Sequence, residues 1–278
     1  MTMLSINTNV GALKAAQASY SVNKSMETSM ARLSSGKRIN SAADDAAGIQ
    51  IANRLTAEIQ GLNQSVRNAA DAQAMLATAE GASHEVHTIL LRMRELAVQA
   101  ANGTADGGGD RAALKSEFDA LESEINRIAS KTTFAGIQLV DGSFTAADSG
   151  KFQVGAYGSE TITHTIENLN TVSIGLPAAI DLTTYTKANS AIVTLDKAIS
   201  NVGTEREQLG AVMNRLDHTI ANLQQVATNL ATAKGRIVDA DFAAETSNLA
   251  RTQVLQQASM AMLSQANAAK QNILALFQ

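Results

Sequence analysis

Two long stretches near the end of the chain contain neither glycine nor proline, and they limit most strongly what the chain can fold into. They are residues 211–234 and 236–278, with only Gly235 between them. Because Gly and Pro most often interrupt helices, each stretch predicts one continuous helix. Apolar residues at steps of three and four, typical of a coiled-coil-like seam, mark the first helix: Leu209, Val212, Leu216, Ile220, Leu223, Val226, Leu230 and Ile237.

The same spacing predicts a long helix from residue 42 to residue 101, about 90 Å in length. Ser41 with Asp44 three residues later indicates a capping box at its start. A further helix follows the glycines at 107–109. The apolar positions expected in the two seams are Ile51, Leu55, Leu62, Val66, Ala69, Leu76, Val86, Ile89, Met93, Leu96 and Ala100 in the long helix, and Leu114, Phe118, Leu121, Ile125 and Ile128 in the next.

The middle of the chain has a different composition. Five of the nine aromatic residues lie between Phe134 and Tyr185, together with many threonines and turn dipeptides such as Asp141-Gly142. Short strands are expected at residues 137–140, 152–154 and 161–166. We therefore expect a mainly α protein: a long, antiparallel, coiled-coil-like helical rod with paired terminal helices and a small β-hairpin element at its distal end.

The two ends of the chain are apolar and almost free of charge. No charged residue precedes Lys14, and none lies between Arg251 and Lys270. A helix that is apolar nearly all round is normally buried on all sides, and two such ends paired within one molecule would still expose apolar surface. The ends therefore predict assembly of many copies, through Ile6, Val10, Leu13, Leu33, Leu249, Leu255, Met262, Leu263, Ile273, Leu276 and Phe277.

Composition argues against several other classes of protein. The net charge is −4 and the basic residues are scattered, so no nucleic-acid surface is indicated. Cysteine is absent, and His84 with His87 lacks the further ligands that a metal site needs. No apolar run reaches the ~18 residues of a membrane span. We expect no enzyme activity, no catalytic residue, no metal and no cofactor, and the uncharged first residues do not resemble a cleaved secretory signal.

Four segments of the chain closely resemble the bacterial flagellins. They are Ser5 to Asn9, residues 33–55 (LSSGKRINSAADDAAGIQIANRL), residues 94–104 (RELAVQAANGT) and residues 236–277, which begin RIVDADFAAETSNLARTQ. The resemblance implies a structural subunit that polymerises into the flagellar filament for motility, with terminal helices in an inner tube. It implies an inner-tube half at 1–40 with its linker, a rod domain at 41–238 with a β element at about 134–185, and a second inner-tube half at 239–278.

The resemblance also implies partners and a location. The expected partners are other copies of the chain, a flagellin export chaperone, and the filament cap and hook-associated proteins. The expected location is the extracellular flagellum, reached through type III export without a cleaved signal peptide. In some flagellins an innate immune receptor recognises the rod, and the matching positions here are Arg92, Leu96, Gln99, Glu117 and Arg215, although Leu91 stands where recognised members usually have Gln.

A second reading remains open from the sequence. A helical adaptor, such as the junction protein between the hook and the filament, would also need apolar terminal helices. That protein would form a short ring rather than a filament of indefinite length. The long match over residues 33–55 favours the filament subunit.

Overall fold

The computed structural model describes residues 8–104, 109–145, 147, 150–177 and 180–275, the last six by their backbone only. Contacts divide the chain into two compact units, residues 1–57 with 229–278, and residues 58–228, each described by itself below. Five helices and two small antiparallel sheets make up the described residues: α1 Val10–Ser35, α2 Ala46–Ala100, α3 Asp110–Lys131, β1 Thr133–Phe134, β2 Ile137–Gln138, β3 Lys151–Gln153, β4 Thr161–Thr163, α4 Tyr185–Val238 and α5 Phe242–Ala275.

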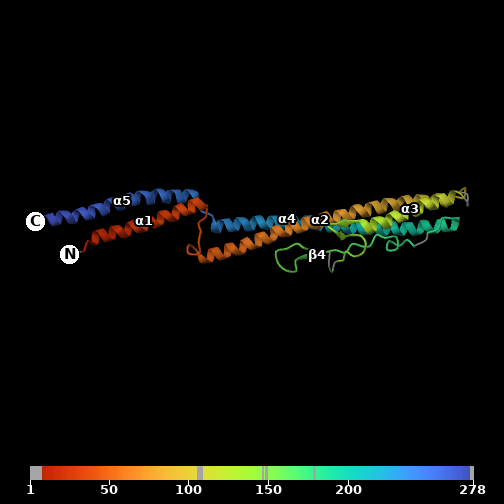
Figure 1. The fold of residues 1–278 in the computed structure, drawn as a ribbon, viewed down its shortest axis with the longest axis horizontal. Coiled ribbons are helices and arrows are strands. Elements are labelled where there is room, and N and C mark those ends of the chain that lie inside the picture. Colours follow the sequence, from red (N-terminus) through yellow and green to blue (C-terminus); the bar gives the residue numbers. More distant parts are fainter. Residues whose placement is uncertain (1–7, 105–108, 146, 148–149, 178–179, 276–278) are drawn as a thin grey trace. The chain divides into compact units, whose positions relative to one another are not determined.

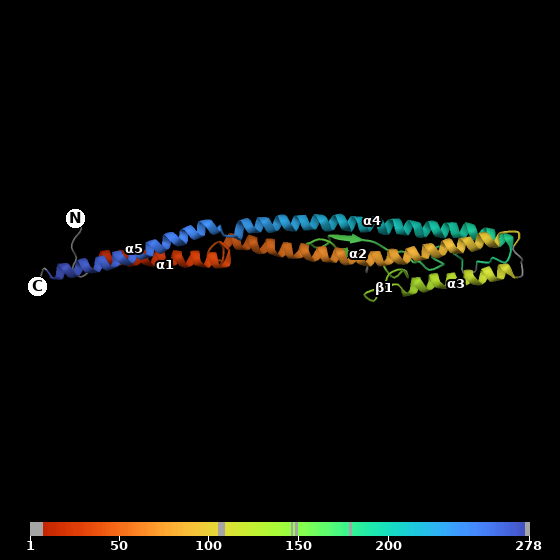
Figure 2. The same cartoon turned by 90° about the horizontal axis from the view of Figure 1, so that it is seen from above.

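In the unit of residues 58–228, α2 and α4 extend side by side and α3 lies along the second half of α2 (Figures 1 and 2). Their facing side chains form one apolar core, which confirms the seams expected from the three- and four-residue steps. Two seam positions are wrong for α2 and α4, because Ile51 and Val226 are exposed, Val226 by 37%. The fully buried members include Leu76, Leu90, Met93 and Leu96 of α2, Phe118 and Ile125 of α3, and Leu195, Leu209 and Leu216 of α4.

The β segment packs on the side of the helices. β3 pairs with β4 in an antiparallel hairpin, with Phe152 opposite Ile162, at the place where two of the expected strands lie. A Cβ on Gly61 of α2 would meet the Cβ of Ala156 at 3.0 Å, so the hairpin turn approaches α2 closely there. Asn68 of α2 also donates to the carbonyl oxygen of Gln153 at 3.2 Å. The hairpin therefore lies alongside α2 rather than beyond the end of the helices.

The start of α2 differs from the expected capping box. Helix α2 begins at Ala46, and Asp45 caps it, because its carboxylate accepts the backbone N–H of Gly48 at 2.8 Å. Asp44 instead accepts the backbone N–H groups of Ser41 and Asn40, at 2.8 and 3.1 Å. These bonds, with that of Ser41 first, lower the pKa of Asp44. The pair Ser41 and Asp44 thus closes a turn before the helix and does not cap it.

The break between the last two helices also lies elsewhere than expected. Helix α4 continues through Gly235 to Val238, and the chain leaves the helix at residues 239–241. Asp241 then starts α5, because its carboxylate accepts the N–H groups of Ala243 and Ala244 at 2.9 and 3.2 Å. A side-chain cap, rather than the glycine, therefore sets the boundary.

Candidate functional site

The two segments that lead into and out of the terminal helices are hydrogen bonded to each other. Lys37 and Asp239 form an antiparallel bridge. The N–H of Arg38 donates to the carbonyl oxygen of Val238 at 2.7 Å, and the N–H of Ala240 donates to that of Gly36 at 3.0 Å. Because these bonds join the end of α1 to the start of α5, the two helices leave the linker as a pair.

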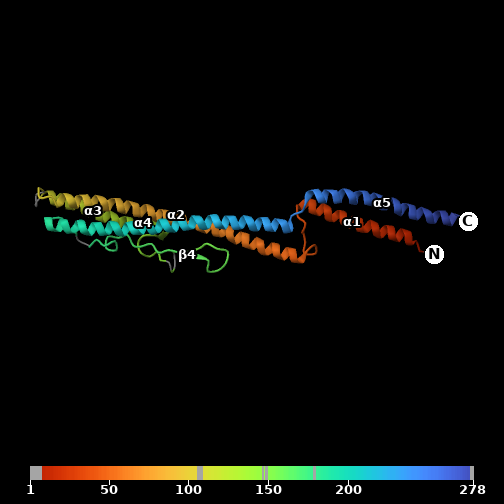
Figure 3. The ribbon, with the colours of Figure 1, turned by 180° about the vertical axis from the view of Figure 1, so that it is seen from behind.

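Helices α1 and α5 then run antiparallel, side by side (Figures 1 and 3). Three contacts along the pair fix its register. Arg32 lies 3.9 Å from Glu245, Gln256 donates to Asn23 at 2.9 Å, and Asn9 donates to the carbonyl oxygen of Ala266 at 3.1 Å. Asn9 also caps α1 by accepting the N–H of Ala12.

Small side chains form the seam of this pair. Ser29 of α1 and Ser259 of α5 are buried, and a Cβ on Gly11 would lie 3.8 Å from the Cβ of Ala266. Residues of this size let the two backbones approach closely, and many Cα atoms of α1 and α5 lie within 8 Å of each other. Such a seam buries little apolar surface, so several large apolar side chains of both helices are left for other contacts.

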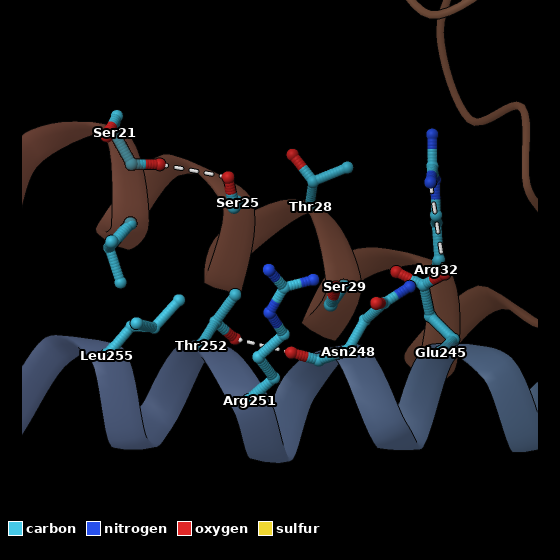
Figure 4. A pocket seen from close by; sticks show the side chains of 11 residues that line it. Ser21, Ser25, Thr28, Ser29, Arg32, Glu245, Asn248, Arg251, Thr252 and Leu255 are labelled. Atoms are coloured by element: carbon cyan, nitrogen blue, oxygen red, sulfur yellow. Dashed lines mark hydrogen bonds and ion pairs between the residues drawn. The ribbon is translucent and has the colours of Figure 1, made fainter. Parts of the chain in front are cut away.

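Two cavities lie along the groove between α1 and α5. One, of about 400 Å³, is lined mainly by polar side chains, including Ser25, Arg32, Glu245 and Arg251, and also by Leu255. In Figure 4, Arg251 extends from α5 toward the side chains of α1. The other cavity, of about 420 Å³, is lined mostly by small residues and by Met262. Its lining residues are Gly11, Lys14, Ala15, Ala18, Ser259, Met262, Gln265 and Ala266.

Several hydroxyl groups along this groove are hydrogen bonded within their own helices. Ser25 donates to the carbonyl oxygen of Ser21 at 3.0 Å, and Thr28 donates to that of Lys24 at 2.9 Å. On α5, Thr252 donates to the carbonyl of Asn248 at 2.9 Å, and Ser259 donates to that of Gln256 at the same distance. These serines and threonines therefore need no partner from the facing helix.

The large apolar residues expected to drive assembly divide into three groups. Val10, Leu13, Leu255 and Met262 are exposed, whereas Leu33, Leu249 and Leu263 are half-buried. Ile6, Leu276 and Phe277 lie outside the described residues, as does the side chain of Ile273. Phe242, at the first position of α5, is also exposed and was missed; an aromatic residue directly after the capping Asp241 was the available signal.

The positions matching the receptor face of some flagellins lie in the other unit. Arg92 donates to Glu117 at 2.8 and 3.0 Å and to Glu95 at 3.0 Å, and these bonds, that to Glu117 first, raise its pKa. Gln99 and Arg215 are exposed as well. Leu96, however, is 1% exposed and belongs to the core, so its place on this face is wrong. Its apolar side chain continues the buried seam of α2.

Two histidines, the partly buried His87 and the buried His164, are the other unusual groups. Burial, with the charges of Arg206 and His84, lowers the pKa of His87, and burial alone lowers that of His164. One ring nitrogen of each has no hydrogen-bond partner in the described part of the chain. Among those same residues, no group of three His, Cys, Asp or Glu side chains is placed to hold a metal ion. No helix there has a stretch suited to crossing a membrane.

These features together define a class of protein. The helices of residues 58–228 bury a continuous core, whereas the α1–α5 pair exposes large apolar residues on both helices, among them Leu13, Tyr20, Val254 and Met260. Exposed apolar surface of this kind marks a site of protein association. The fold is that of a helical structural subunit.

Comparisons with known proteins identify the family. Residues 6–145 match the bacterial flagellin N-terminal helical region, and residues 192–277 match the C-terminal helical region. A flagellin of Halalkalibacterium halodurans is 45% identical, covering 91% of this chain and 92% of that protein. A flagellin of Bacillus subtilis is 38% identical over 98% of this chain and 99% of its own length. The chain belongs to the bacterial flagellin family.

As a flagellin, it is an extracellular structural subunit that polymerises with its own copies into the flagellar filament, serves motility and associates with hook-associated proteins. A putative flagellar hook-associated protein from Vibrio parahaemolyticus is similar in fold, with a TM-score of 0.57 over 70% of this chain and 100% of that chain. Its sequence identity is 18%, so this likeness concerns the fold alone.

Proposed function

We propose that the outward faces of α1 and α5 are the surfaces through which copies pack in the filament. The observation that carries this proposal is the exposure of large apolar residues on both helices of a closely packed pair. Val254 is 65% exposed and Met260 is 56% exposed, and both lie in the uncharged stretch between Arg251 and Lys270. Burial of such side chains contributes about 1.5–3 kcal/mol each, and a filament multiplies this gain over many copies.

A pair of matched substitutions tests this proposal. Val254→Asp leaves the separate molecule folded, because the position is exposed, but places a charge where the next copy packs. Val193→Asp is the control, since Val193 is a helical valine of α4 with a similar exposure of 57%. We expect sedimentation and electron microscopy to show filaments for the control and none for Val254→Asp. Normal filaments from Val254→Asp would contradict the proposal.

The same α5 face supports a second role before assembly. An export chaperone can cover the apolar face of a helix that later becomes buried in the filament, and Leu255, Met260 and Met262 supply such a face. Methionines suit a surface that must fit two partners in turn, because their side chains are flexible. We also propose that the domains divide at 40/41 and 238/239. The end of α4 at Val238 supports the second of these boundaries.

For the innate immune receptor, the exposed positions Arg92, Gln99, Glu117 and Arg215 support a polar contact. The hydrogen bonds between Arg92 and Glu117 join α2 to α3 and hold both side chains in place. Leu91 adds an exposed apolar side chain one residue before Arg92. Binding of the receptor ectodomain to the separate molecule, with Arg92→Ala as the variant, tests this role.

A further inference from the structure

A line of three exposed residues runs along the outer side of α1. Leu13, Tyr20 and Glu27 are spaced seven apart, so they lie close to one line on the helix. Leu13 is 62% exposed, Tyr20 is 73% exposed, and Glu27 is exposed as well. Glu27 lies two residues from both Ser25 and Ser29, which line the groove, and this places it about 200° around the helix from each of them. The line therefore faces away from α5.

The groove between α1 and α5 carries three α5 residues whose chemistry complements that of Glu27, Tyr20 and Leu13. Arg251 and Leu255 line the polar cavity, and Met262 lines the apolar one. Their order along α5 is cation, apolar, apolar, and the order on the outer line of α1 is anion, aromatic, apolar. Glu27 to Leu13 spans about 21 Å and Arg251 to Met262 about 16 Å, so the two sets differ in length by about one helical turn.

Glu27 and Arg251 lie at about the same height along the helix pair, and the apolar residues of both sets follow toward the same end of the pair. Arg32 contacts Glu245 on one side of this level, and Asn23 contacts Gln256 on the other. Glu27 lies between Asn23 and Arg32 in α1, and Arg251 lies between Glu245 and Gln256 in α5. From there, Tyr20 and Leu13 follow on α1 as Leu255 and Met262 follow on α5. A copy placed beside the first in the same orientation brings the two sets together.

The charges of these helices favour that placement. Helices α1 and α5 contain five basic residues, Lys14, Lys24, Arg32, Arg251 and Lys270, and two acidic ones, Glu27 and Glu245. Glu245 pairs with Arg32. Within the described residues, Glu27 and Arg251 have no ion pair or hydrogen bond from their side chains. Each copy thus offers one free carboxylate on one side and one free guanidinium on the other.

We propose that the outer line of α1, formed by Leu13, Tyr20 and Glu27, docks in the α1–α5 groove of a neighbouring copy, with Glu27 paired to that copy's Arg251. The contact joins two different surfaces, so each copy uses one as donor and one as acceptor, and the contact propagates. The inference rests on the proposed function of the terminal pair and adds which surfaces meet and which charges set their register. Opposite charges at such a contact fix specificity and orientation.

Charge reversal tests the pairing in the full chain. Glu27→Lys places two cations together at the contact, and Arg251→Glu places two anions there. We expect each variant alone to raise the critical concentration for polymerisation by roughly tenfold or more, since like charges at a contact are costly. Arg54→Glu, which makes the same change at an exposed residue of α2, should leave that concentration unchanged. Helix content and thermal melting of the separate variants check that folding is retained.

Mixing the two variants separates a contact between copies from one within a copy. In an equal mixture, the cation introduced by Glu27→Lys in one copy meets the anion introduced by Arg251→Glu in its neighbour. At the next contact, the unchanged Glu27 of the second variant meets the unchanged Arg251 of the first. We expect the mixture to polymerise near the concentration of the unsubstituted chain, whereas neither variant does so alone. The Glu27→Lys, Arg251→Glu double variant should polymerise likewise.

Two results would overturn the inference. If either single variant polymerises like the unsubstituted chain, the pair sets no register. If the double variant is rescued and the mixture is not, the pair forms within one copy. Both results leave the role of the terminal pair intact, which Val254→Asp tests separately: filaments from that variant would remove the proposed function itself.

Discussion

Arg38 and Val238 are joined by a backbone hydrogen bond of 2.7 Å, and the guanidinium of Arg38 also donates to the carbonyl oxygen of Ile237 at 2.6 Å. Together with the bond from Ala240 to Gly36, they make a short ladder between the two linkers of the terminal pair. The ladder starts directly where α1 ends, so the chain must leave the helix at Gly36. Gly36 makes this possible with a left-handed φ of +68°.

Substituting Gly36 by Ala should therefore destabilise the terminal pair by about 1 kcal/mol. A Cβ at this position would meet no atom within 4 Å, so the cost arises from the backbone conformation alone. Gly81→Ala is the matched control, because Gly81 lies inside α2 with equally open space around it. That change should stabilise its unit by about 0.5–1 kcal/mol. Urea denaturation followed by circular dichroism measures both, and equal signs for the two variants would refute this account of Gly36.

The second prediction concerns the seam of α4. Leu223 is 8% exposed, so Leu223→Asp buries a charge without a partner and should cost about 3 kcal/mol or more in the free energy of unfolding. Val226→Asp, three residues later in the same helix, should cost less than about 1 kcal/mol because Val226 is already exposed. Chemical denaturation of residues 58–228 in the full chain compares the two. Equal losses would mean that the two faces of α4 are wrongly assigned.

The third prediction concerns the pH dependence of stability. Glu205 of α4 is buried, and this burial raises its pKa; one carboxylate oxygen accepts the N–H of Glu167 at 3.3 Å. Because the folded state holds this proton more tightly than the unfolded state, the contribution of Glu205 to stability is present at low pH. It is lost as the pH rises above the ordinary glutamate value of 4.5.

Glu205→Gln should consequently stabilise the unit of residues 58–228 at pH 7 and give no such gain below pH 4, since Gln can still accept the bond from Glu167 without a charge. Thermal melting of the variant and the unsubstituted chain across this pH range gives the difference. Glu207→Gln, an exposed position two residues later, is the control. A gain that persists unchanged at low pH would show that the charge of Glu205 is not the cause.

The sequence predicted the helices well where burial follows a regular period. Leu209, Leu216 and Leu223 are buried because steps of seven residues keep one face of α4 toward its neighbours. The predicted seam is wrong at Val226 because one turn of a straight helix takes 3.6 residues. Two successive three-residue steps, from Ile220 to Leu223 and on to Val226, therefore move the side chain off the buried face. At the start of α2, Ala52 rather than Ile51 takes the buried position.

Helix ends were less predictable, because they depend on which polar group reaches a free N–H. Both Asp44 and Asp45 could cap a helix, and only the path of the chain decides that Asp45 reaches Gly48. Gly235 was similarly misleading, since one glycine inside a long helix costs about 1 kcal/mol, which packing can offset. The burial of Leu96 follows from its place in the apolar seam with Met93 and Ala100, which are also buried. That spacing predicted its position correctly, whereas the resemblance to the receptor face did not.

The hydrogen bonds that Ser25, Thr28, Thr252 and Ser259 make to carbonyls of their own helices have a consequence for the change of environment that polymerisation brings. A hydroxyl that depends on water for its partner would be left unsatisfied when neighbouring subunits exclude that water. Because the acceptor of each of these hydroxyls is a carbonyl oxygen of the same helix, the hydrogen bond persists when water is excluded. The same groove can therefore be hydrated in a single molecule and dry inside a filament. The terminal helices can thus stay dissolved before they polymerise without weakening the polymer afterwards.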